Sequence, residues 1–78
     1  MATYFFNWQC GVDRVDDESG RDVADLATAV RVGLREMRGL ISEDALEGRI
    51  RLAQRIEIED AEHRFIQRLV VGDAVTFV

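Results

Sequence analysis

Alternating side chains at the start of the chain predict a β-strand over residues 3–9. This stretch is rich in aromatic residues and contains a threonine, and both favour extended structure. Because successive side chains of a strand point to opposite faces, Tyr4, Phe6 and Trp8 share one face. Phe5 points to the other face, so large aromatic side chains occupy both faces of this strand.

Turn-forming and acidic residues follow the strand. Gly11 favours a turn over residues 10–13, and Arg14 with Val15 can begin a short returning strand. Residues 16–20 read Asp-Asp-Glu-Ser-Gly and contain no apolar anchor. We therefore expect a loop over this acidic stretch.

A long amphipathic helix is predicted from about Asp25 to about Glu47. Asp25 is a suitable N-cap because its carboxylate can accept the free amide hydrogens of the first helical turn. Gly48 is a natural C-terminal stop. The apolar positions recur with a helical period and form one stripe, made of Leu26, Ala29, Val30, Gly33, Leu34, Met37, Leu40, Ile41 and Ala45.

Asp44 interrupts this apolar stripe, and two explanations are open. The helix can extend beyond the sheet at that point, or Gly39 can break it and Ser42 can cap a short second turn. A helix of this length spans about 33 Å, whereas a six-residue strand covers about 20 Å. An overhanging helix is therefore the simpler explanation.

The second half of the chain predicts a β-hairpin. Residues 49–54 are ambiguous, but Arg55–Glu59 alternates cleanly as a strand with one buried face. A turn over residues 60–63 leads to a second strand over residues 64–71, and residues 72–74 form a further turn. The order is β-β-α-β-β in a single domain, residues 1–78. We expect an α+β fold with one amphipathic helix packed on a small, mostly antiparallel sheet.

Composition and charge narrow the classes of function. Hydrophobic residues make up 47% of the chain and the net charge is −5, which is typical of a folded acidic domain. An acidic surface repels phosphate backbones, so nucleic acid is an unlikely partner. No apolar run is long enough to cross a membrane. Cys10 is the sole cysteine, and no secretory signal pattern is present, so we expect a cytoplasmic protein.

Residues with catalytic or metal-binding chemistry are few. Cys10 and His63 are the nucleophile and soft-ligand candidates, and no second cysteine or histidine exists to complete a zinc site. The acidic stretch does not have the spacing of an EF-hand loop. No glycine-rich phosphate-binding loop precedes the helix. We therefore predict no enzymatic activity, no catalytic residue, no cofactor and no metal site.

Two features indicate an interaction surface instead. Arg31, Arg35 and Arg38 form a stripe on the helix away from its apolar face, with no acidic residue three or four positions from any of them. Phe5 lies on the sheet face that a single helix cannot cover. Chain ends or sheet twist could instead cover Phe5, and the arginines could form an ordinary solvated face. Phe5, Arg31, Arg35 and Arg38 are the candidate interaction residues.

Several short motifs occur in an order that is similar to a known family. They are Tyr4-Phe5-Phe6, Asp17-Glu18-Ser19-Gly20, Asp25-Leu26 with Ala29, Ile56-Glu57-Ile58 with Asp60, Arg64, and Asp73-Ala74-Val75. The chain resembles short bacterial proteins, frequent in alpha-proteobacteria, that open with a Tyr-Phe-Phe strand and form a domain of unknown function. Cys10, Arg14, His63 and Val70 depart from the usual pattern. The resemblance implies the fold and no activity, cofactor or site residue.

A weaker similarity, to the HicB-like antitoxins, rests on a capped helix after an antiparallel hairpin. It is a fold-level analogy and carries little functional weight. The expected function is a non-catalytic protein-interaction module, acting alone or as a homodimer, with an unknown protein or itself as partner. The alternatives are a HicB-like antitoxin or regulatory domain and a small ligand-binding protein.

Overall fold

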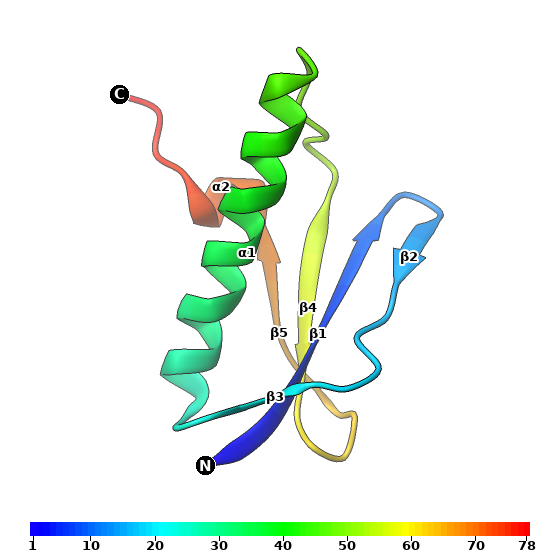
Figure 1. Cartoon of the computed structure of the whole chain (residues 1–78), viewed down its shortest axis with the longest axis vertical. Helices are drawn as coiled ribbons and strands as arrows, with labels where there is room; N and C mark the ends of the chain where they lie inside the picture. The colour runs from blue at the N-terminus through cyan, green and yellow to red at the C-terminus, as the bar shows by residue number, and fades with distance from the viewer.

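The computed structural model describes residues 1–78 as an α+β fold. Two helices and an open sheet of five antiparallel strands make up the chain, and α1 lies across one face of the sheet (Figure 1). The element order is β1 (Ala2–Cys10), β2 (Asp13–Val15), β3 (Arg21–Val23), α1 (Leu26–Leu46), β4 (Arg55–Glu59), β5 (Phe65–Val70) and α2 (Val71–Ala74). The predicted fold class is confirmed.

The sheet has the order β2-β1-β4-β5, and β3 also pairs with β1. β2 lies against residues 8–10 of β1, and β3 lies against residues 2–4 of the same strand. The predicted order β-β-α-β-β is therefore wrong by one strand, because β3 was not foreseen. Its three residues carry no strand period of their own, and the free edge of β1 supplies their partner.

Helix α1 begins and ends as the sequence predicts. The backbone N–H of Thr28 donates to the Asp25 carboxylate at 2.8 Å, which caps the first turn. Gly48 has a φ of 85° just after the helix, a conformation that favours glycine. The helix runs unbroken through Gly39, so the alternative of a break there with a new cap at Ser42 is wrong.

Asp44 is buried even though it lies near the end of α1. The residue is only 5% exposed because the connection between α1 and β4 folds back against it. The Asp44 carboxylate accepts hydrogen bonds from Arg51 Nη2 at 2.7 Å and from Gln54 Nε2 at 3.0 Å. The ambiguous residues 49–54 thus form a loop that covers the misfit in the apolar stripe.

The core lies between α1 and the sheet. Its buried members come from five elements, β1, α1, β4, β5 and α2, and they are Phe6, Ala29, Met37, Ile56, Ile58, Leu69, Val71 and Ala74. Gly33 allows the closest approach, because a Cβ there would lie 2.5 Å from Leu69 Cδ1. The helix can therefore pack directly on β5 only because this position has no side chain.

The predicted hairpin is present as β4 and β5. β4 has the expected bounds, and the two strands pair from Arg55 opposite Val70 to Glu59 opposite Phe65. A bulge lies between Ile58 and Glu59. The expected turn after β5 is the short helix α2, in which the Asp73 carboxylate accepts the Val70 N–H at 2.9 Å. Neither helix has the length and apolar character that a membrane crossing requires.

Candidate functional site

Of the two alternatives that the sequence leaves open for Phe5, exposure or cover by the chain itself, the structure shows cover. Only 9% of the residue is exposed. The His63 ring stacks on the Phe5 ring with centroids 4.2 Å apart. Phe5 also lies against the loop before β3, where a Cβ on Gly20 would lie 3.0 Å from Phe5 Cε1. Phe5 therefore offers little surface to a partner.

The three arginines of the predicted stripe lie exposed on α1, away from Phe5. Arg38 Nε donates to the Ala74 carbonyl at 2.8 Å and so ties α1 to α2. Arg31 Nη2 donates to Thr28 Oγ1 at 3.2 Å, and Arg35 has no hydrogen bond or ion pair. Because α1 and Phe5 lie on opposite sides of the sheet, these residues do not form one surface. Their role in binding stays a prediction.

Cys10 and His63 lie far apart along the sheet. Cys10 ends β1 opposite Asp13, whereas His63 lies in the turn beyond Glu59, which pairs with Phe5. His63 Nδ1 is 3.2 Å from Glu59 Oε1, and its backbone has a φ of 63°. The arrangement gives His63 a carboxylate neighbour and an aromatic contact but no nucleophile.

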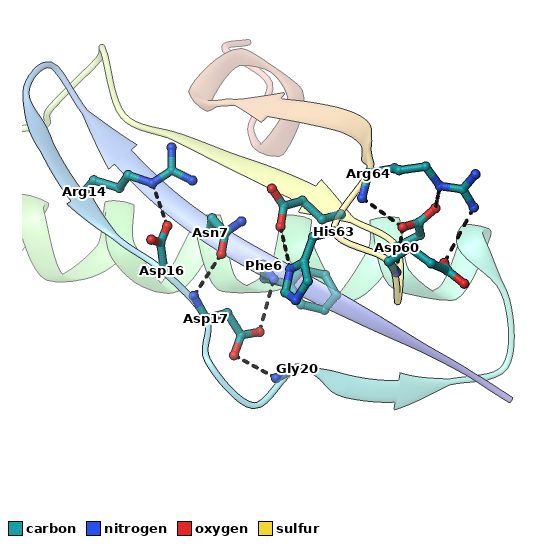
Figure 2. Close-up of polar contacts among 11 residues, drawn as sticks. Phe6, Asn7, Arg14, Asp16, Asp17, Gly20, Asp60, His63 and Arg64 are labelled. Atoms are coloured by element: carbon teal, nitrogen blue, oxygen red, sulfur yellow. Dashed lines mark hydrogen bonds and ion pairs between the residues drawn. The ribbon is translucent and has the colours of Figure 1, made fainter.

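The acidic loop after β2 has a structural role (Figure 2). β2 and β3 leave a gap on the edge of β1, and the Asp17 carboxylate accepts the Phe6 N–H there at 3.1 Å. The same carboxylate accepts the Gly20 N–H at 3.0 Å, and the Asp17 N–H donates to Asn7 Oδ1 at 2.8 Å. These bonds satisfy main-chain groups that pairing alone would leave free. No group of carboxylates, cysteines or histidines is arranged to hold a metal ion.

Two further carboxylates are held in the charged form by hydrogen bonds. The guanidinium and main-chain N–H of Arg51 lower the pKa of Asp44. The main-chain N–H of Arg64, followed by that of Glu62, lowers the pKa of Asp60 in the β4–β5 turn. Through these hydrogen bonds both carboxylates hold loops in place.

The open edge of β5 is the candidate interaction surface in the structure. Five of the six residues of β5 are exposed. Phe65, Ile66 and Val70 are 57%, 38% and 42% exposed, and they place apolar side chains along the strand. The opposite edge of the sheet is occupied by β2, β3 and Asp17, whereas β5 has a neighbour on one side only.

Sequence reasoning did not find this surface. The apolar residues of Phe65–Val70 indicate a strand, but an edge strand and a central strand have similar residues over so short a length. Strand order depends on which elements pair, and no local signal in the sequence carries that information.

Comparison with protein families gives one match. A family described as a domain of unknown function, DUF6894, matches residues 3–72. The matched segment runs from β1 into α2 and so contains every strand and the whole of α1. Comparison with curated proteins gives no match, and comparison with solved structures gives none. Because the match covers almost the entire chain, the protein belongs to the DUF6894 family of domains of unknown function.

Proposed function

We propose that this domain is a non-catalytic protein-interaction module that pairs through the open edge of β5, with a second copy of the chain as partner. The observation that supports this most directly is the combination of an unpaired strand edge with three exposed apolar side chains. Soluble proteins usually protect free strand edges with charges, prolines, bulges or covering elements, and β5 carries only Arg68 and the register shift at Ile66 as such features. An edge that keeps apolar side chains is suited to strand addition.

The main chain of β5 supports pairing centred on Arg68. The Val70 N–H donates to the Asp73 side chain of its own chain and so is not free for a partner strand. This leaves Arg68, two residues earlier, as the next residue with main-chain groups on the open edge. An antiparallel pair related by a two-fold axis at Arg68 would place the two Arg68 residues opposite each other. Each Arg68 is bonded to Glu57 of its own chain at 2.9 Å, which offsets the repulsion between them.

The experiment that tests this proposal is the solution mass over a roughly hundredfold concentration range, measured by light scattering after size exclusion. The variant Ile66→Lys places a charge on the β5 edge, and Val12→Lys places the same charge on a fully exposed apolar residue in the distant β1–β2 turn. We expect a dimer for the unmodified protein and for Val12→Lys, and a monomer for Ile66→Lys. A monomer for the unmodified protein at every concentration would contradict self-pairing.

We further propose that the protein is bacterial and cytoplasmic. The resemblance to bacterial proteins that open with Tyr4-Phe5-Phe6 supports a bacterial source, and a single cysteine is consistent with a reducing compartment such as the cytoplasm. Localisation of a tagged copy in an alpha-proteobacterial cell would test this part. Recovery from the periplasm or the membrane fraction would contradict it.

A further inference from the structure

An apolar groove lies beside α1, on the face of the sheet that α1 covers. It lies toward the β2 edge of the sheet and away from β5. α1 packs mainly on β4, β5 and β3 and makes few contacts with β1 and β2 on the same face. The space between them has a cavity volume of about 530 Å³, within the range of small-molecule sites. Its apolar lining comes from the sheet and the helix, and consists of Phe6, Trp8, Val15, Leu40 and Ile56.

Of the three charged side chains that line the groove, two are paired within the chain and one is not. Glu36, on the α1 wall, forms an ion pair with Arg21. Arg51 lies over the Trp8 ring, 5.2 Å from its centroid, and is bonded to Asp44 at 2.7 Å. Glu43, two turns of helix beyond Glu36, forms no hydrogen bond or ion pair. The groove therefore has one uncompensated charge at its rim, and that charge is negative.

Gly39 forms the helix wall between the two glutamates. A Cβ at Gly39 would have no atom of the chain within 4 Å, whereas a Cβ at Gly33 would meet Leu69. Glycine in the middle of a helix is less stable than alanine, so it usually has a packing reason. The packing of this chain explains Gly33 but not Gly39. The missing side chain at Gly39 widens the groove at its centre.

We propose that this groove binds a small organic cation, an amine that carries an apolar body. The apolar body would lie on the groove lining beside Gly39, where it would share the Trp8 ring with Arg51, and the ammonium group would face the Glu43 carboxylate at the rim. Burial of the apolar body favours binding, and the opposite charge selects amines over acids of the same shape. This site is separate from the β5 edge, so it can be tested independently of self-pairing.

Trp8 is the single tryptophan of the chain and lies in the groove, so its fluorescence reports on an occupant. Two probes with the same apolar body and opposite charge are 4-phenylbutylamine and 4-phenylbutyrate. We expect a saturable change in Trp8 emission with the amine at a concentration roughly tenfold below that needed for the acid, because an exposed ion pair is worth a few-fold and repulsion of the acid adds to it. An equal response to both probes, or no saturable response to the amine, would overturn the proposal.

Three variants locate the site. Glu43→Gln should remove most of the preference for the amine, whereas Glu47→Gln, at the C-cap of α1 and outside the groove lining, should leave it unchanged. Gly39→Leu should fill the groove and abolish the response. A cooperative thermal melt of this variant would show that it is folded. Retention of amine binding in a folded Gly39→Leu protein would place the probe elsewhere and overturn the assignment.

Discussion

The imidazole of His63 stacks on the ring of Phe5, with centroids 4.2 Å apart and ring planes inclined by 28°. His63 comes from the β4–β5 turn and Phe5 from β1, so the contact closes one end of the sheet face that α1 does not cover. Because of this contact, the Phe5 ring is covered, although it lies on the sheet face that α1 leaves open. Phe5 belongs to the folded interior, and the turn residue that covers it is exposed.

Replacement of His63 tests this cover without removing the turn. Asparagine tolerates the positive φ of this position, so His63→Asn removes the ring and keeps the backbone conformation. We expect a loss of roughly 0.5–1 kcal/mol in the free energy of unfolding, the usual worth of an aromatic pair. Urea denaturation measures it, and a variant as stable as the original would show that the stacking contributes nothing.

Truncation of Phe5 should have a much larger effect. Phe5 is 9% exposed, and removal of a buried phenylalanine costs about 3–5 kcal/mol, which approaches the whole stability of so small a domain. We expect Phe5→Ala to be largely unfolded by circular dichroism, and Phe5→Leu to fold with reduced stability. A folded and fully stable Phe5→Ala would indicate that the ring is a surface group after all.

The same substitution at two glycines of α1 should have opposite effects. At Gly39 a methyl group meets nothing, so Gly39→Ala should raise the free energy of unfolding by about 0.5–1 kcal/mol. At Gly33 a methyl group would displace Leu69, which is 1% exposed and has no room to move. Overpacking costs about 1–3 kcal/mol, so Gly33→Ala should be destabilising. Changes of the same sign in parallel thermal melts would contradict the difference.

The Asp44–Arg51 pair should hold the connection between α1 and β4 in place. Asp44→Asn keeps the shape of the side chain but removes the charge that Arg51 and Gln54 contact. Gln54 also accepts the Trp8 Nε1–H at 3.2 Å, so loosening of this loop should shift Trp8 emission to longer wavelength. Glu47→Gln is the control. Unchanged emission in Asp44→Asn would mean that the loop is held by other contacts.

Stability should fall in acid because three carboxylates have lowered pKa values. Hydrogen bonds from Thr28 lower the pKa of Asp25, those from Arg51 lower that of Asp44, and those from Arg64 lower that of Asp60. The unfolded chain then binds protons more readily, so the stabilisation is complete above the ordinary aspartate pKa, about 4. It is lost as the pH falls through the lowered values.

Thermal melts between neutral pH and about pH 2 measure this loss. The Asp44→Asn variant should show a shallower fall than the unmodified protein, since one of the three groups no longer titrates. An identical pH profile in the variant would show that Asp44 does not contribute to the acid sensitivity.

Much of the fold follows from local signals. The Asp25 cap, the helical period and Gly48 define α1, and clean alternation defines β4 to the residue. These elements depend on interactions between residues close in sequence, which a pattern can reveal. β3 and α2 depend instead on contacts with segments distant in sequence. β3 pairs with β1, and α2 packs against α1. Asp44 was recognised as a misfit, but its partners lie in a loop without periodicity.

The sequence by itself determined the α+β class, the capped helix, the hairpin and the acidic character, since each depends on the order and type of nearby residues. Only the tertiary structure decided that Phe5 is covered by His63, that Asp17 closes the edge of β1, and that β5 stays open. It also decided that a groove lies between Trp8 and Gly39. Coverage of a face or an edge depends on which distant segments meet, and short-range patterns do not encode that pairing.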